Sequence, residues 1–112
     1  MRGAAVKLAA PWWGELGLAE GVEDALSVLQ LTGVPCWAVC GAARLREIDL
    51  PDDVMRVTIF RDNDEAGIAA AERAEWHYRS VVGVAARIWA PPGDGVKDWN
   101  QILQKRIQYN GR

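Results

Sequence analysis

The chain has 112 residues, of which half are hydrophobic and a quarter are charged. This composition fits a single globular domain with one core. Its formal net charge of −2 excludes binding of a phosphate backbone through bulk charge alone, so a nucleic-acid ligand would have to be held by metal ions or by other domains. The sequence has neither a long apolar run nor a signal-peptide pattern, so we expect no membrane contact and a cytoplasmic location.

Strand and helix patterns alternate from one end of the chain to the other. Apolar or β-branched runs predict five strands, at Ala4–Leu8, Leu16–Ala19, Pro35–Cys40, Val57–Phe60 and Val84–Ala90. Helical periodicity or composition predicts helices from Val22 to a stop at Gly33, and over Ala42–Ile48, Glu65–Val82 and Asp98–Ile107. We therefore predict a three-layer, Rossmann-like α/β fold, with a mostly parallel sheet of four to five strands and helices on both faces.

No linker and no internal repeat interrupt this alternation. We therefore expect residues 1–112 to form one domain, excised from a larger protein. Six tryptophans are many for this length. Trp12 and Trp13 lie in a Pro/Gly-flanked loop, where an exposed pair would mark a contact with the rest of a longer protein. Trp37 and Trp89 lie in apolar runs and are predicted to be core residues.

Cys36 and Cys40 form a single C-x-x-x-C pair inside an apolar stretch, and the chain has only one histidine, His77. A structural zinc site needs more ligands than this. We therefore expect two buried, reduced thiols, and we expect His77 to be a packing or surface residue of its helix.

Acidic residues follow three of the predicted strands. Glu20 comes after Leu16–Ala19, with Asp24 one helical turn later; Asp62 and Asp64 come after Val57–Phe60; and Asp98, preceded by Lys97, follows the last strand and its loop. Ligand sites of open α/β sheets lie at the carboxyl ends of the strands, so these groups should converge on one rim. Mg²⁺, with Mn²⁺ as the alternative, favours a few carboxylates and leaves room for substrate phosphates.

Each acidic group also has a purely structural explanation. An Asp-x-Asp at a strand end is often a helix N-cap beside a solvated neighbour. Glu20 could pair with the dipole of the following helix, and Lys97 with Asp98 could form a surface ion pair of small energetic worth. The coincidence of three acidic groups at three strand ends is what favours a functional site.

Three segments resemble the motifs of the Toprim domain family. Gly17–Leu26 resembles the first motif, a strand that ends in Glu-Gly before a helix. Arg61–Gly67 resembles the second, Asp-x-Asp-x-x-Gly, and Pro91–Leu103 is similar to the Gly-Lys-Asp-x-Asp/Asn segment of primases. The resemblance extends from about Gly3 to Leu103. It is strongest to the Toprim domains of phage- and plasmid-type DNA primases and primase-helicases.

The resemblance implies a role for each residue of the rim. Glu20 would be the catalytic acid/base or a metal-linked glutamate, and Asp62 and Asp64 would bind Mg²⁺. Asp24 and Asp98 would be supporting metal-site carboxylates, and Lys97 would contact phosphate. The chain departs from cellular primases at Asn100, where they commonly carry a second Asp, which puts a second metal ion in doubt.

The resemblance implies Mg²⁺-dependent nucleotidyl transfer, with a single-stranded DNA template and nucleotides reached through the full-length protein. A zinc-ribbon or a helicase would be the neighbouring domain. A Toprim nuclease and a non-catalytic Toprim-fold binding module are the alternatives. The sequence leaves open the template preference, the neighbouring domains, the oligomeric state, the number of metal ions and the activity of the isolated domain.

Overall fold

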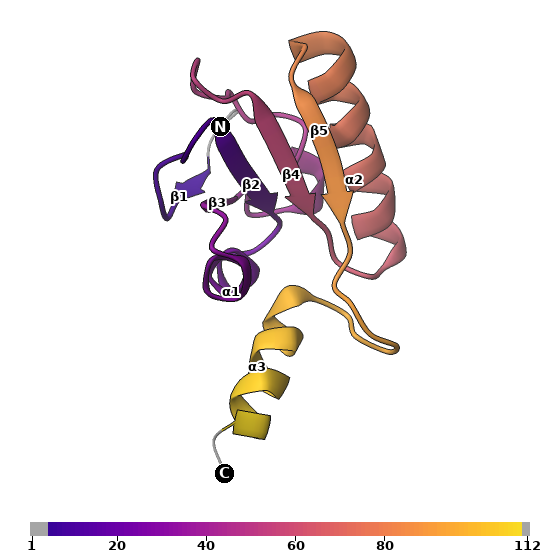
Figure 1. Cartoon of the computed structure of the whole chain (residues 1–112). Coiled ribbons are helices and arrows are strands. Elements are labelled where there is room, and N and C mark those ends of the chain that lie inside the picture. The colour runs from indigo at the N-terminus through magenta and orange to yellow at the C-terminus, as the bar shows by residue number, and fades with distance from the viewer. Residues whose placement is uncertain (1–4, 111–112) are drawn as a thin grey trace.

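Five strands form one sheet in the order β1-β3-β2-β4-β5 in the computed structural model, which describes residues 5–110. The strands are β1 (Val6–Lys7), β2 (Glu15–Ala19), β3 (Cys36–Ala38), β4 (Arg56–Phe60) and β5 (Ala85–Trp89). Strands β2 to β5 are parallel to one another, and β1 pairs with β3 in the antiparallel direction (Figure 1). The mostly parallel sheet predicted from the sequence is confirmed.

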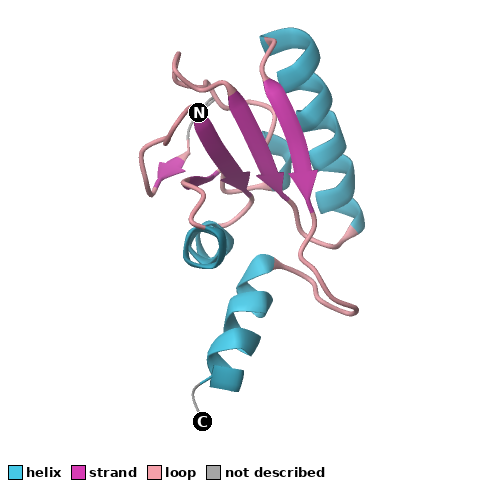
Figure 2. Ribbon diagram, in the orientation of Figure 1, coloured by secondary structure: helices cyan, strands magenta, loops and turns pink. Residues whose placement is uncertain are grey.

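Helices cover both faces of this sheet, as Figure 2 shows. They are α1 (Val22–Thr32), α2 (Glu65–His77) and α3 (Trp99–Asn110), with a 3₁₀ turn η1 (Ala42–Arg44) and a π-helical turn η2 (Tyr78–Val82) that continues α2. Helix α2 packs on the strands from one side, whereas α1 and α3 contact each other and contribute to the core on the other side. The predicted three-layer α/β fold is confirmed.

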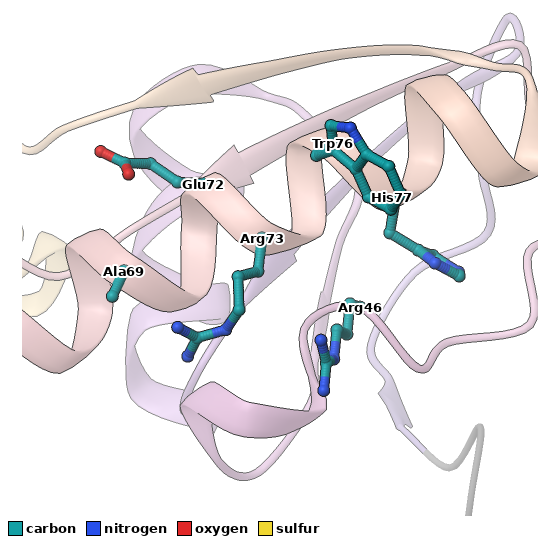
Figure 3. Close-up of a pocket in the computed structure, with 6 residues that line it drawn as sticks. All are labelled: Arg46, Ala69, Glu72, Arg73, Trp76 and His77. Atoms are coloured by element: carbon teal, nitrogen blue, oxygen red, sulfur yellow. The ribbon is translucent and has the colours of Figure 1, made fainter.

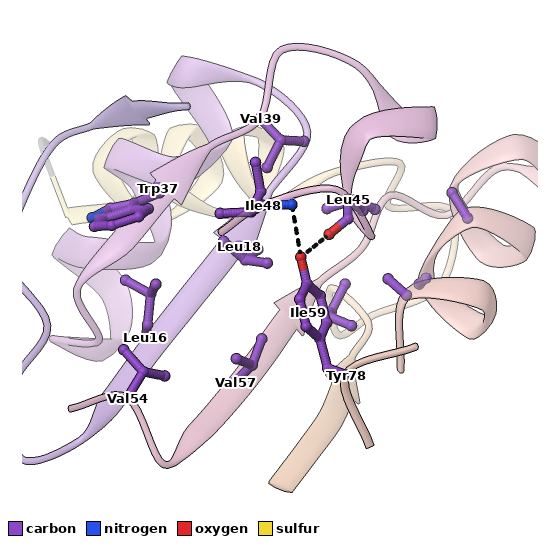
Figure 4. Packing of buried hydrophobic residues seen from close by; sticks show 13 residues of the cluster. Leu16, Leu18, Trp37, Val39, Leu45, Ile48, Val54, Val57, Ile59 and Tyr78 are labelled. Carbon is purple, nitrogen blue, oxygen red and sulfur yellow. Dashed lines mark hydrogen bonds between the residues drawn. The ribbon is translucent and has the colours of Figure 1, made fainter. Parts of the chain in front are cut away.

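The larger core cluster lies on the α2 side of the sheet (Figure 4). Side chains alternate between the faces of a strand, so Leu16 and Leu18 of β2 and Val57 and Ile59 of β4 all enter this cluster. Tyr78 is fully buried beside them. Its hydroxyl donates to the Leu45 carbonyl and accepts from the Ile48 amide, and burial raises the pKa of Tyr78 to about 12.

A smaller cluster fills the opposite side of the sheet, where α1 and α3 meet the strands. Phe60 of β4 packs edge-to-face on Trp99 of α3 with ring centroids 5.2 Å apart. Gly17 of β2 faces the same ring, and a Cβ at this position would lie 2.9 Å from Phe60 Cε2. The cluster therefore fixes the start of α3 next to the carboxyl end of β4.

Several expectations from the sequence are wrong in detail. Trp89 is 40 % exposed because β5 is an edge strand with one open face, whereas the predictions of a buried Trp37 and of exposed Trp12 and Trp13 are confirmed. Cys40 is exposed because the chain leaves the sheet after β3, so of the two thiols only Cys36 is buried.

The predicted element bounds also change. The helix expected over Ala42–Ile48 is only the η1 turn, and the helix expected up to Val82 changes from α to π geometry after His77. The first strand is a two-residue edge strand, and Ala4 of its predicted range lies outside the described residues. Among residues 5–110, no helix has the length and apolar character needed to cross a bilayer.

Candidate functional site

The first acidic segment lies where β2 ends and α1 begins. Glu20 directly follows β2, and Gly21 then takes an extended conformation (φ −118°) that turns the chain into the helix. Asp24, in the first turn of α1, is only 8 % exposed. Its Oδ1 accepts a hydrogen bond from the Asn100 backbone amide at 3.0 Å, so the start of α3 holds Asp24 in place.

The second acidic segment, the Asp-x-Asp-x-x-Gly motif, gives its two carboxylates different tasks. Asp64 is the N-cap of α2, and its Oδ1 accepts from the Gly67 amide at 2.6 Å. A Cβ on Gly67 would lie 2.9 Å from both the Asp62 carbonyl oxygen and Asp64 Oδ1, so this turn needs glycine for close approach. The capping explanation therefore describes Asp64, and Asp62 is the member of the pair that faces Glu20 and Asp24.

Asp62 is the most perturbed carboxyl of the rim. Burial, then the charges of Asp24 and Glu20, raise its pKa to about 8. Burial is also the main cause that raises the pKa of Asp24. Asp62 Oδ1 is buried and finds no hydrogen-bond partner among residues 5–110, but a protonated Asp62 could donate to Glu20 or Asp24. The three carboxyls therefore lie close together without enough neighbouring positive charge to neutralise them.

The third segment, which contains Lys97 and Asp98, is hydrogen-bonded to the second. The Asn63 backbone amide donates to the Lys97 carbonyl and its Nδ2 donates to the Val96 carbonyl, both at 2.7 Å. Asp98 caps α3 by accepting from the Gln101 amide at 2.9 Å. Its charge contributes to the raised pKa of Asp24. Lys97 is exposed and forms no ion pair in the described part of the chain.

Asn100, the departure from the primase pattern, faces α1 rather than the carboxyl cluster. Its Oδ1 accepts from the Ser27 hydroxyl at 3.3 Å, and its Nδ2 donates to Glu23 Oε2 at 3.1 Å. An Asp here would oppose the Glu23 carboxylate and lose that donor. In this chain, position 100 joins α3 to α1.

Taken together, the structure brings Glu20, Asp24 and Asp62 into one cluster, which we call the carboxyl triad, with Asp98 close enough to act on Asp24. Both ion pairs within residues 5–110 involve Glu15, so no Lys or Arg of this part of the chain pairs with any of the four carboxyls.

The donor set fits a divalent cation. All three groups of the triad offer oxygen, the ligand type that Mg²⁺ prefers, and Asp62 Oδ1 is a buried acceptor without a donor. As they stand, however, no three His, Cys, Asp or Glu side chains among the described residues are already arranged around an ion. Small side-chain rotations would therefore have to accompany binding. Deprotonation of Asp62 would also have to accompany binding, because metal ligands bind as carboxylates.

Two residues that organise this site were not singled out as such from the sequence. Asn63 ties the second segment to the third, and Ser27 ties α1 to Asn100. The middle position of an Asp-x-Asp motif gives no chemical signal for such a role. Ser27 gave a weak signal in the sequence, because it is a polar residue next to the apolar positions of an amphipathic helix.

Comparisons with known proteins identify the family and agree with the fold. A family model described as a Toprim domain matches residues 15–108. The chain belongs to the Toprim domain family. A comparison with curated proteins found no match.

Two solved structures are similar to this Toprim domain in fold. One is a DNA primase domain from Pseudomonas aeruginosa, with 21% identity and a TM-score of 0.57; the match covers 81% of this chain and 29% of that one. The other is the DnaG catalytic core, with 22% identity and a TM-score of 0.56, covering 82% of this chain and 30% of that one. The Toprim domain therefore spans less than a third of either structure.

Proposed function

We propose that this Toprim domain carries out Mg²⁺-dependent nucleotidyl transfer on nucleic acid as the catalytic part of a DNA primase-like protein. The observation that supports this most strongly is the carboxyl triad of Glu20, Asp24 and Asp62 at the carboxyl ends of two neighbouring strands. Three crowded carboxyls without a cationic partner are unfavourable unless a proton or a metal ion joins them.

Each residue of the rim has a task in this proposal. Asp62 and Glu20 would hold Mg²⁺, together with Asp64, which caps α2 through Oδ1. Asp24 is fixed by the Asn100 amide and would steady the triad. When bound, Mg²⁺ would neutralise charge on the reacting phosphate and make an attacking 3′-hydroxyl more acidic.

Glu20 is the best candidate to accept the hydroxyl proton where it does not itself hold the metal, since it is partly exposed whereas Asp24 is buried. Asp98 would add negative charge at a greater distance, and Lys97 would contact a substrate phosphate with its exposed side chain.

We further propose that the domain works within a longer protein. A net charge of −2 is unsuited to holding a template, and the two primase structures are more than three times longer than the matched region. Single-stranded DNA template and nucleotides would be held jointly with other domains, such as a zinc-ribbon or a helicase.

The decisive experiment measures incorporation of labelled ribonucleotides on single-stranded template by the longest form of the protein, with Mg²⁺ or Mn²⁺. We expect template-dependent synthesis that is lost in Asp62→Asn. Synthesis should be kept in Asp52→Asn. This control changes an exposed carboxylate that precedes β4, at the amino ends of the strands rather than at their carboxyl ends.

Two results would overturn the proposal. Nicking of plasmid DNA with metal but without nucleotides, lost in Asp62→Asn, would identify a nuclease. A Mg²⁺ titration followed by NMR that shifts no amide near Glu20, Asp62 or Asp98, even with nucleotide present, would identify a non-catalytic binding module.

A further inference from the structure

A basic hollow lies on α2, away from the carboxyl triad. It has a volume of about 340 Å³ and is lined by Arg46, Ala69, Glu72, Arg73, Trp76 and His77. Ala69, Glu72, Arg73, Trp76 and His77 fall at i, i+3, i+4, i+7 and i+8 of α2, so one helix face supplies them. Arg46 comes from the segment after η1, which packs against that helix.

Two arginines converge on this hollow without a carboxylate partner. In Figure 3 the guanidinium groups of Arg46 and Arg73 lie on one side of α2, and the Glu72 carboxylate, which also lines the hollow, points away from them. Neither arginine forms an ion pair with any described residue. Glu47 and Asp49 line an adjacent hollow that shares Arg46 and His77, but they do not line this one.

An aromatic side chain also lines the hollow. Trp76 is 65 % exposed, which leaves a large apolar ring in water. Two guanidinium groups without an ion pair and an exposed indole in one hollow match the parts of a nucleic-acid strand, since arginine forks bind phosphate and an aromatic ring stacks on a base. The volume is of the size that accommodates one small ligand unit.

We infer that the hollow between Arg46 and Arg73 binds the phosphate of a single-stranded nucleic acid, with a neighbouring base stacked on Trp76. This inference does not depend on the proposed catalytic function. Arg73 lies nine residues beyond the Asp64 cap, or about 13 Å along α2 at the rise of an α-helix. The hollow therefore supplies, away from the acidic rim, the local positive charge that the whole chain lacks.

The test is titration of a fluorescent oligothymidylate with the chain, followed by anisotropy in a chelating buffer so that no divalent ion reaches the triad. The variant is Arg46→Gln with Arg73→Gln. The matched control is Arg79→Gln with Arg44→Gln, which removes two exposed arginines that do not line the hollow. All four side chains are exposed, so each variant should keep the melting temperature of the parent.

We expect the hollow variant to bind the oligonucleotide roughly tenfold more weakly or worse, with the control close to the parent. The slope of log affinity against log salt should fall by about 1.4, the value for two lost phosphate contacts on a single strand. The Trp76 indole N–H signal, assigned with Trp76→Phe, should shift on binding. Because the chelating buffer keeps divalent ions from the triad, the affinity measured in this way is separate from metal-dependent binding at the proposed active site.

Equal loss of affinity in the hollow variant and its control would overturn the inference, because the binding would then be bulk electrostatics. Inorganic phosphate and thymidine monophosphate are the comparison ligands. If either binds as tightly as the oligonucleotide, or if the Trp76 signal stays unmoved, the hollow is not a strand site.

Discussion

Glu20 and Asp62 follow two adjacent parallel strands, and they lie close enough for the Glu20 charge to add to the effect of burial in raising the pKa of Asp62. Strands β2 and β4 pair in register from Glu15 with Arg56 to Ala19 with Phe60, so the residues that follow each strand leave the sheet close together. Their proximity, with Asp24 beside them, raises the pKa of Asp62 to about 8, with burial as the largest cause. The acidic site is therefore a direct consequence of strand order.

Without metal, the free energy of unfolding of the chain should fall as pH rises from about 4 to about 8. Asp62 loses its proton near pH 4 when unfolded but only near pH 8 when folded, so between these values the folded state binds more protons and rising pH favours unfolding. Asp62→Asn removes this penalty. We expect Asp62→Asn to raise the urea midpoint more at about pH 8 than at about pH 5 in a chelating buffer.

The control for this pH effect is Asp52→Asn, whose effect on the midpoint should not change with pH because Asp52 is exposed in a turn. If both variants respond to pH alike, Asp62 does not titrate in the way that the geometry implies.

The double change Asp62→Asn with Asp64→Asn should remove Mg²⁺ binding and preserve the fold. Asn caps a helix about as well as Asp, so α2 should keep its start, and the loss of charge relieves the repulsion at the rim. Thermal melting with and without Mg²⁺ tests this: the parent should gain stability with Mg²⁺ in proportion to ligand binding, and the double variant should gain none. A folded double variant with the parent's response to Mg²⁺ would disprove the site assignment.

The cap can be separated from metal binding at Asp64 itself. Asp64→Ala removes the acceptor for the Gly67 amide and should cost about 1 kcal/mol of unfolding free energy, whereas Asp64→Asn should cost much less. Urea denaturation in a chelating buffer gives both values. Equal stability of the two variants would show that the cap contributes nothing.

Gly67→Ala should damage the site through the backbone. The added Cβ would meet the Asp62 carbonyl and Asp64 Oδ1 at 2.9 Å, so the turn would have to shift, with a cost of about 1–3 kcal/mol typical of overpacking. Ala66→Ser, at the exposed neighbouring position, should stay within about 0.5 kcal/mol of the parent. Denaturation midpoints of the two variants check this, and a neutral Gly67→Ala would refute the tight turn.

The sequence predicted the layers, the strands and the convergence of acidic segments because these follow from hydrophobic runs and from the rule for parallel strands. The division of labour between Asp62 and Asp64 was not predictable, since two carboxylates two residues apart look alike until one finds a helix amide to cap. The predictions that Trp89 and Cys40 are buried were wrong for a similar reason. An apolar run does not reveal which strand lies at the sheet edge or where the chain leaves the sheet.

Tyr78→Phe tests the opposite end of α2, far from the triad along the helix. The Tyr78 hydroxyl is the buried partner of both the Leu45 carbonyl and the Ile48 amide, so its removal leaves two backbone groups without that bond. We expect a loss of about 1–3 kcal/mol in the free energy of unfolding, measured by urea denaturation. Mg²⁺ binding should be unchanged, because the triad depends on the ends of β2 and β4 rather than on this contact. A parent-like midpoint for Tyr78→Phe would mean that the segment from Leu45 to Ile48 is held by apolar packing alone.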